Sequence, residues 1–527
     1  MDAPAPAQKT FTHRQILLII GGLLTGMGLA GLDQTIVDTA LPTIVGELGG
    51  LNHLSWVVTA YLLTSTVSTP IYGKLSDIYG RRRLFQVAIV VFLVGSMLCG
   101  IAANMPELIA FRGLQGIGGG GLIAMAFAVI ADVVPPRERG RYTGYIVAVF
   151  AVTSVVGPVL GGLFVDHLTW RWIFYVNVPL GGIALVVTSR ALDLPFVVHR
   201  RRIDFEGAAL LVAGVTGLLL ALVWGGDQYP WGSGTIIGLG SGGIALVAAF
   251  LWWERAKAED PLVPLRLFSN SVFRLGAAMS FLLSVAQFGG IVFLPIFLQI
   301  VAGRSATNSG LNLLPLMLGL LVASIWSGRR ISTTGRYKRY PITGFALVAV
   351  VLVLFSTMDA HTSVAAITVY MTVFGAGLGM VSPIITTAVQ NAVDMRDLGV
   401  ATGGNTFFRN LGGAFGVAVF GSILNNRLAG ELAHRIPRGT VGDPTSFLHT
   451  PAAIRQLPSA VRTGVTQAVS HSVTTVFLWA TPIAVLGVIA ALLLPELPLR
   501  QHSAIAAPAG DDDNVDADIA LGAAHLN

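Results

Sequence analysis

Charged residues are scarce in this 527-residue chain: they make up 11% of it, against about 25% in soluble globular domains. Hydrophobic residues make up 54%, and the mean hydropathy is +0.73. A surface so poor in charge does not suit water, so the composition predicts a protein of the lipid bilayer. The net charge of +6 does not indicate nucleic acid as a partner, because the basic residues fall in short loops between apolar segments.

Cysteine is also nearly absent, since Cys99 is the single one in the sequence. This excludes an intramolecular disulfide framework and any multi-cysteine metal site. A Walker A motif, an HExxH motif and a nucleophile elbow are missing too, and the run "GIGGGG" at 116–121 lies inside an apolar segment with no Lys-Ser/Thr after it. The sequence therefore predicts no enzyme, no cofactor and no bound metal.

Long apolar runs are abundant, and about 20 residues suffice for a helix to cross roughly 30 Å of hydrocarbon. Fourteen such runs predict an all-α membrane protein with 14 transmembrane helices. They lie near 16–37, 54–73, 84–103, 107–131, 142–165, 172–190, 207–225, 235–253, 275–301, 310–327, 340–357, 364–388, 399–423 and 474–494.

The basic residues predict the topology, because cytoplasmic loops are rich in Lys and Arg. Loops after even-numbered spans hold 21 of them, whereas the first six loops after odd-numbered spans hold two, Arg171 and Arg304. Both termini are therefore expected in the cytoplasm of a multi-pass protein in the cell inner (plasma) membrane. The seventh outer loop, 425–472, holds five arginines but is long, and long loops cross with less regard to charge.

That outer loop also carries apolar residues at helical spacing toward its end, from Ile454 and Leu457 to Val461, Val465 and Val469. The spacing predicts an amphipathic helix on the outer surface that leads into the last span.

An internal repeat divides the chain. "GKLSDIYGRRR" after the second span and "GRRISTTGRYKR" after the tenth share two glycines and an arginine at equal spacing, and "GIGGGGLIAM" matches "GAGLGMVSPI" about 259 residues later. The repeat unit is six helices. The predicted parts are a cytoplasmic segment 1–15, a six-helix bundle 16–190, a linker 191–206, an inserted helix pair 207–253, a linker 254–274, a second six-helix bundle 275–494 and a disordered acidic tail 495–527.

Asp33, in "GLAGLDQTIVDTALPT", places a carboxylate where the first span should still be buried. A charge near the bilayer centre costs about 2.5 to 3.5 kcal/mol on insertion scales, so it usually faces the protein interior and marks an ion or proton path. Asp33 is the leading candidate for a proton carrier. The alternative is that the first span ends before it. Asp38, a turn and a half onward, could share or compete for the proton.

Two arginines also fall inside predicted spans. Arg112, about five residues into the fourth span and followed by Gln115, stays protonated and could hold a facing acid. The alternative interpretation is that the Arg112 side chain extends to the outer surface of the membrane. Arg409, in "FFRNLGGAFG", could line the interior or satisfy backbone carbonyls.

Five motifs stand in order in the first 182 residues: "LDQTIVDTALPTI", "GKLSDIYGRRR", "RGLQGIGGGG", "GPVLGG" and "WRWIFYVNVPLG". Together with fourteen spans they resemble the major facilitator superfamily, in its branch of fourteen-helix drug:proton antiporters, which includes multidrug efflux transporters of bacterial, actinobacterial type. The resemblance implies two six-helix bundles, proton coupling through Asp33 and Arg112, and conformational roles for Gly73, Asp77, Gly80 and Arg81. Many relatives have Asn at the position of Asp38, so a second acid is a departure.

"GPVLGG" in the fifth span has a mechanical interpretation of its own. Pro158 removes a backbone hydrogen bond and kinks a helix, while Gly157, Gly161 and Gly162 let a neighbouring helix pack closely. The motif also resembles one that is associated with exporters in the superfamily, which favours efflux over uptake.

The predicted function is a proton-coupled antiporter that exports lipophilic small molecules or drugs by alternating access, as a monomer in the lipid bilayer. Uptake with protons, export of an endogenous lipid or metabolite, and a non-transporting scaffold or sensor remain alternatives. The suggested substrate cavity is apolar with a few polar groups. Its predicted lining residues, most of which could equally be packing residues, are Gln34, Trp56, Tyr61, Gln115, Phe288, Asn312 and Arg409.

Overall fold

A computed structural model describes residues 13–48, 54–134, 136–192, 204–226, 228–256, 265–303, 313–394, 397–435 and 458–499. Within these ranges the chain is helical and has no strand beyond one isolated bridge between Gly225 and Tyr229. Thirteen of the helical segments described there are long and apolar enough to cross a membrane. The prediction of an all-α, multi-pass membrane protein is confirmed.

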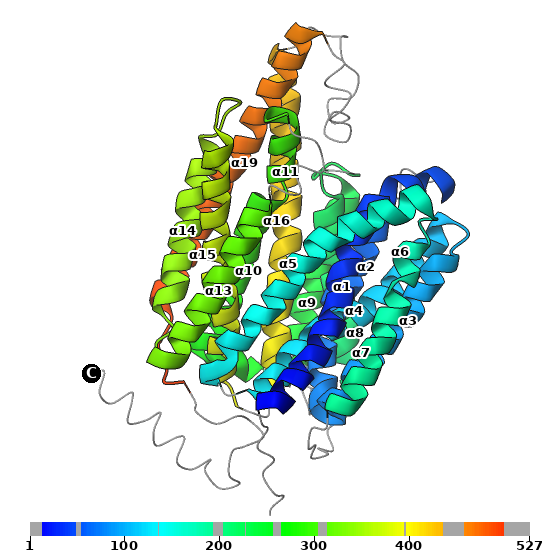
Figure 1. Cartoon of the computed structure of the whole chain (residues 1–527), viewed down its shortest axis with the longest axis vertical. Coiled ribbons are helices and arrows are strands. Elements are labelled where there is room, and N and C mark those ends of the chain that lie inside the picture. Colours follow the sequence, from blue (N-terminus) through cyan, green and yellow to red (C-terminus); the bar gives the residue numbers. More distant parts are fainter. Residues whose placement is uncertain are drawn as a thin grey trace, which may run out of the picture.

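The helices form two halves with an inserted pair between them (Figure 1). The first half comprises α1 (His13–Leu48), α2 (Leu54–Tyr79), α3 (Arg81–Ile101), α4 (Met105–Val133), α5 (Pro136–His167), α6 (Trp172–Tyr175) and α7 (Asn177–Ala191). The inserted pair is α8 (Phe205–Trp224) and α9 (Gly234–Ala256). The second half comprises η2 (Leu265–Ser269), α10 (Ser271–Ile291), α11 (Leu294–Ile296), η3 (Phe297–Val301), α13 (Leu314–Thr334), α14 (Arg339–Ser356), α15 (Val364–Ala392), α16 (Leu398–Arg435) and α19 (Ser459–Leu493).

Helix α2 is the fourteenth long segment, although it is not among the thirteen apolar ones. Its 26 residues are rich in serine and threonine, and the buried hydroxyls of Ser65, Thr66 and Thr69 donate to backbone carbonyls of the preceding turn. Because α2 packs against α4 and α16, these hydroxyls face protein. The part of the chain that the structure describes is therefore consistent with the predicted fourteen membrane-spanning segments.

The glycines of the predicted repeat pack in the same way in both halves. A Cβ atom on Gly116 of α4 would lie 2.4 Å from a backbone oxygen of α2, and one on Gly375 of α15 would lie 1.9 Å from a backbone oxygen of α13. One turn further along, a Cβ atom on Gly120 would lie 2.2 Å from another backbone oxygen of α2, and one on Gly379 would lie 2.2 Å from another backbone oxygen of α13. Glycine is required at these positions because the helices touch backbone to backbone.

The matched loops after α2 and α13 also share a backbone conformation. Gly80 has φ 91° and Gly335 has φ 71°, in the region that residues with a Cβ atom rarely adopt. Each glycine ends a helix and turns the chain into the next one, so the two loops are structural counterparts.

The start of α1 and the end of α19 lie at the same end of the bundle, which we call the basic end; the opposite end is the far end (Figure 1). The halves contact each other toward the basic end. A Cβ atom on Gly73 of α2 would lie 2.9 Å from the backbone oxygen of Gly399 in α16. Helix α5 also packs along α13.

Helices α16 and α19 project beyond the other helices at the far end (Figure 1). Both ends of the predicted outer loop 425–472 are helical, because α16 continues to Arg435 and α19 begins at Ser459. Val465 and Val469 are fully buried in one cluster with Leu428 of α16. The predicted amphipathic helix therefore stands upright along α16 as the start of α19, because its apolar stripe is covered by a helix instead of by lipid. Ile454 and Leu457 lie outside the described residues.

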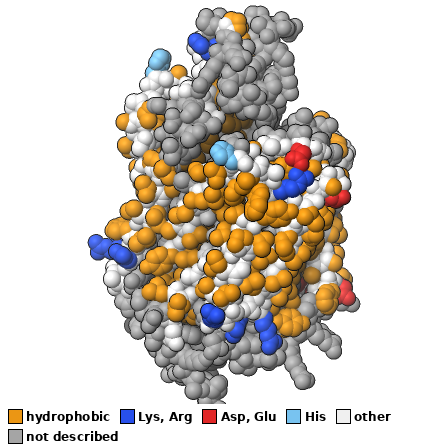
Figure 2. All heavy atoms as spheres, turned by 45° about the vertical axis from the view of Figure 1, so that its right-hand side comes forward, with side chains coloured by type: hydrophobic (Ala, Val, Ile, Leu, Met, Phe, Trp, Pro, Cys, Tyr) orange, Lys and Arg blue, Asp and Glu red, His pale blue; other side chains and the backbone are white. Residues whose placement is uncertain are grey.

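On the face that Figure 2 shows, hydrophobic side chains cover the middle, and most of the charged side chains lie toward the two ends. This distribution fits a bilayer around the middle of the bundle. The predicted segment 1–15, the linker 191–206 and the tail 495–527 lie mostly outside the described residues, and of the linker 254–274 residues 257–264 do.

Candidate functional site

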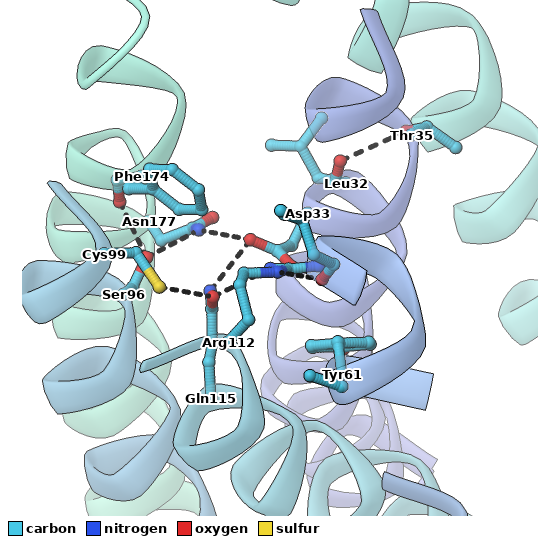
Figure 3. A network of polar contacts seen from close by, with 12 residues as sticks. Leu32, Asp33, Thr35, Tyr61, Ser96, Cys99, Arg112, Gln115, Phe174 and Asn177 are labelled. Atoms are coloured by element: carbon cyan, nitrogen blue, oxygen red, sulfur yellow. Dashed lines mark hydrogen bonds and ion pairs between the residues drawn. The ribbon is translucent and has the colours of Figure 1, made fainter. Parts of the chain in front are cut away.

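Asp33 lies within α1, which continues as helix to Leu48, and its side chain is fully buried. The alternative that the first span ends before Asp33 is therefore wrong. Its carboxylate faces the interior of the first half (Figure 3).

Three side chains from two other helices bind this carboxylate (Figure 3). Arg112 Nη1 of α4 lies 2.6 Å from Asp33 Oδ2, and Gln115 Nε2 donates to Oδ1 at 2.8 Å. Asn177 Nδ2, from the first residue of α7, lies 3.2 Å from the same Oδ1. Arg112 is 1% exposed. The alternative interpretation, in which its side chain extends to the outer surface, is therefore wrong.

Arg112 has further partners besides the acid. Its Nε donates to the backbone oxygen of Val57 at 3.2 Å, and its Nη1 lies 2.8 Å from Gln115 Oε1. The guanidinium carbon lies 4.4 Å from the centroid of the Tyr61 ring, within the range of a cation–π contact. Arg112 therefore has two hydrogen-bond acceptors and an aromatic face as partners in addition to Asp33.

A second layer of hydrogen bonds orients the amides. Asn177 Nδ2 also contacts Ser96 Oγ at 3.0 Å, and the Ser96 hydroxyl donates to the backbone oxygen of Phe174 at 2.9 Å. The Cys99 thiol lies 3.6 Å from Gln115 Oε1. The sequence reasoning did not single out Asn177 or Ser96, because uncharged polar residues are frequent in membrane helices. The available signal was an asparagine inside the motif "WRWIFYVNVPLG", where the chain breaks between α6 and α7.

One buried polar atom beside the ion pair, Asn177 Oδ1, has no hydrogen-bond partner in the described part of the chain. An unsatisfied buried acceptor is rare and costly. Asn177 Oδ1 is therefore an acceptor left free next to a carboxylate that, when ionised, has no proton to donate.

The loop motif at the basic end forms a second cluster. Arg81 Nε lies 2.8 Å from Asp132 Oδ2 at the end of α4, and Arg81 also contacts the Ser76 hydroxyl. Gly80 turns the chain between α2 and α3, and Gly73 supplies the close contact with α16. The loop thus holds α2, α3 and α4 together where the two halves meet. The side chain of Asp77 is outside the described atoms.

The "GPVLGG" motif contributes one close contact that the structure describes. A Cβ atom on Gly157 would lie 2.0 Å from the hydroxyl oxygen of Thr35, and that hydroxyl donates to the backbone oxygen of Thr153 at 2.9 Å. Helix α5 is therefore in close contact with α1 two residues beyond Asp33. Gly161 is buried, whereas Gly162 faces open space, with no atom within 4 Å of a Cβ. The helix continues through Pro158, whose side chain is outside the described atoms.

The other residues predicted to line a cavity do not gather around Asp33. The Trp56 ring lies 5.0 Å from the ring of Trp224 in α8, edge to face. Phe288 is 37% exposed on α10. Arg409 of α16 lies over Phe127 of α4, with 5.5 Å between its guanidinium carbon and the ring centroid.

Gln34 is half-buried and follows Asp33 in α1. The side chain of Asp38 and all of Asn312 lie outside the part that the structure describes. Within that part, no three His, Cys, Asp or Glu side chains form a group that could hold a metal ion.

Comparisons with known proteins agree with this architecture. The profile of the Major Facilitator Superfamily matches residues 23–417. The Multidrug transporter protein MdtP of Bacillus subtilis is 41% identical over 419 residues, covering 80% of this chain and 77% of that protein. An uncharacterized MFS-type transporter of Mycobacterium tuberculosis is 43% identical over 482 residues, covering 92% of this chain and 70% of that protein. Multidrug resistance protein 3 of Bacillus subtilis is 36% identical over 486 residues, with coverages of 90% and 94%.

Two solved structures share the fold. The proton:xylose symporter XylE superposes with a TM-score of 0.60 at 13% identity, covering 94% of this chain and 99% of that one. The human organic anion transporter MFSD10 superposes with a TM-score of 0.59 at 16% identity, covering 89% and 99%. At these identities the likeness concerns the fold alone. The fourteen long helices, the internal repeat, the buried pair of Asp33 and Arg112 and the family match lead to one conclusion: the chain belongs to the major facilitator superfamily and is a membrane transporter, not an enzyme.

Proposed function

We propose that this transporter exports lipophilic small molecules in exchange for protons, and that Asp33 carries the proton. The observation that supports this most strongly is the ion pair at 2.6 Å between Asp33 and Arg112, inside a bundle with little other buried charge. A buried carboxylate that is held by three donors is stable while ionised. Protonation would cancel the ion pair, so the position of the proton and the packing of three helices depend on each other.

The neighbouring groups suit either protonation state. When Asp33 takes up a proton, its carboxyl becomes a donor, and Asn177 Oδ1 is a free acceptor beside it. Arg112 then keeps the Val57 carbonyl, the Gln115 oxygen and the Tyr61 ring as partners. Neither state leaves a buried charge without hydrogen bonds, which is the requirement for a group that must load and release a proton in each cycle.

A continuous set of contacts links this pair to the interface between the halves. Asp33 lies on α1, and Thr35 on the same helix contacts Gly157 and Thr153 of α5. Helix α5 in turn packs along α13 of the second half. When protonation releases α1 from α4 and α7, α5 can change its position against α13. Movement of one half against the other is the expected form of alternating access.

The energy available is sufficient for export. A proton-motive force of about 150 mV is worth about 3.5 kcal/mol per proton, which corresponds to a gradient of about 300-fold for a neutral substrate. Two features favour export over uptake: the "GPVLGG" motif, and relatives whose names describe multidrug transporters. The alternative of uptake with protons predicts the opposite direction of movement under the same gradient.

Transport in inside-out vesicles tests the proposal. An acid-inside gradient should drive accumulation of a lipophilic dye by the wild type, and a protonophore should abolish it. The variant Asp33→Asn should insert and fold but fail to accumulate the dye, with Arg427→Gln on the exposed far-end part of α16 as the control. Release of protons by the purified Asp33→Asn variant on dye binding, at the wild-type level, would show that the proton is carried elsewhere.

We also propose that the basic end faces the cytoplasm of the cell, because the loops there carry most of the Lys and Arg residues. A reporter fused after residue 202 should then be cytoplasmic, and one fused after residue 450 should lie outside. Finding both on the same side would contradict this orientation.

A further inference from the structure

A second deep charge, Arg409, has no role in the pair of Asp33 and Arg112. Arg409 lies eleven residues after the start of α16 at Leu398, or about 16 Å along the helix, within the apolar span Leu398–Arg435. Its guanidinium lies over the ring of Phe127, a residue of the other half that is 7% exposed. The charge is therefore directed into the interface between the halves, not toward lipid.

No acid neutralises Arg409 within the described part of the chain, where it makes neither a hydrogen bond nor an ion pair. Of the other buried acids in the described ranges, Asp397 pairs with Arg266 and Glu254 lies on the inserted helix α9, while the half-buried Asp132 pairs with Arg81. A half-buried guanidinium inside a membrane span that rests only on an aromatic face lacks the anionic partner that arginines in such places usually have.

The surroundings of Arg409 are polar on one side and aromatic on the other. Asn405, one turn earlier on α16, is buried and hydrogen-bonded to Ser280 of α10. Gln390 of α15 donates to the backbone oxygen of Phe127, the residue whose ring the guanidinium contacts, at 3.4 Å. Arg409 thus lies where α16 meets α4, with the apolar ring of Phe127 beside its guanidinium.

We propose that Arg409 is the binding site for an anionic group, a carboxylate or phenolate, on the lipophilic substrates of this transporter. This rests on the proposed export function and specifies its substrate class as amphipathic organic monoanions. The guanidinium offers a planar fork that matches a carboxylate with two parallel hydrogen bonds. The apolar part of the substrate would lie against Phe127 in the interface between the halves.

A pair of fluorescent probes of equal size tests this: pyrenebutyric acid, which is anionic, and its neutral amide, pyrenebutyramide. Binding to the purified full chain is measured by fluorescence anisotropy in detergent micelles at neutral pH, with empty micelles as the baseline. The wild type should bind the acid about tenfold more tightly than the amide. Arg409→Gln should abolish that preference, and Arg409→Lys should keep part of it because the charge remains and the fork is lost.

The matched control is Arg427→Gln, which removes an exposed arginine of the same helix and should leave both affinities unchanged. Equal affinity of the wild type for the acid and the amide would overturn the proposal. So would an Arg409→Gln variant that loses affinity for the acid and for the amide by the same factor, because Arg409 would then act only in packing. If Arg409→Gln does not fold, the ratio of the affinities for acid and amide in the wild type and in Arg409→Lys still tests the proposal. Because the binding assay uses no proton gradient, a failure of proton coupling and a failure of anion recognition are distinguishable.

Discussion

The buried pair of Asp33 and Arg112 predicts a strong non-additivity in stability. In Arg112→Met the carboxylate of Asp33 keeps two amide donors but loses its cation. Removing one partner of a buried ion pair costs about 3 to 5 kcal/mol in free energy of unfolding, because the other charge remains buried. In the double variant Asp33→Asn/Arg112→Met no charge remains, so we expect a loss below about 2 kcal/mol, which is close to that of neutral hydrogen bonds.

The assay is equilibrium unfolding of the purified protein in mixed micelles, titrated with a denaturing detergent. The four members of the cycle give the coupling energy directly. The cost of Arg112→Met should also fall as the pH is lowered, because proton uptake then neutralises the carboxylate that lost its partner. Losses that simply add up in the double variant, or a cost that does not change with pH, would refute an ion pair between these residues.

Two further predictions concern other contacts. Gly73→Leu should stop transport without preventing insertion, because even a Cβ atom would lie 2.9 Å from a backbone oxygen of α16; Gly162→Ala, where no atom lies within 4 Å, should transport normally. The hydrogen bond from Arg171 lowers the pKa of Glu47 from its ordinary 4.5, so the pair stabilises the fold above that pH and the effect is lost as pH falls through the lowered pKa. Because both side chains are partly exposed, Glu47→Gln should cost at most about 1 kcal/mol at neutral pH and nothing at strongly acidic pH, as measured by unfolding at both pH values.

The sequence was most informative where one charge contradicts its surroundings. Asp33 and Arg112 were identified because a charge inside an apolar run has few explanations, and the structure places them in contact. Asn177 carries no charge, and its distance from Asp33 in sequence gives no reason to pair them. Only the break between α6 and α7 brings its amide to the carboxylate, and a tertiary arrangement of this kind is not encoded in any local pattern.

Hydropathy located the spans but not the lengths of the helices. The ends of α16 and α19 carry Glu431, Arg435, Gln467 and His471, which form contacts with one another outside the apolar zone. Polar residues of this kind predict a loop in a hydropathy analysis, although two helices can continue past the bilayer when they pack against each other. The opposite occurs in α2, whose serines and threonines lower its apolarity although it lies among the other helices.

The distance between the two deep charges makes a last prediction possible. Fifteen residues of α4 separate Arg112 from Phe127, over which Arg409 lies, or about 22 Å at the rise of a helix. At that distance two charges interact by less than about 1 kcal/mol even at an effective dielectric constant near 20. If the two sites interact only through their charges, Asp33→Asn should change the affinity for pyrenebutyric acid by no more than about fivefold. The affinity for the neutral amide should then be unaffected.

Coupling through helix rearrangement has a different signature, because a shift between conformations alters the binding of both probes by the same factor. We therefore expect Asp33→Asn to change the affinities for pyrenebutyric acid and pyrenebutyramide in parallel, measured by anisotropy with Arg427→Gln as the unaffected control. A change confined to the acid would mean that the two sites communicate only by their charge. In that case the contacts from α1 through α5 to α13 would not transmit the protonation of Asp33 to the interface where Arg409 lies.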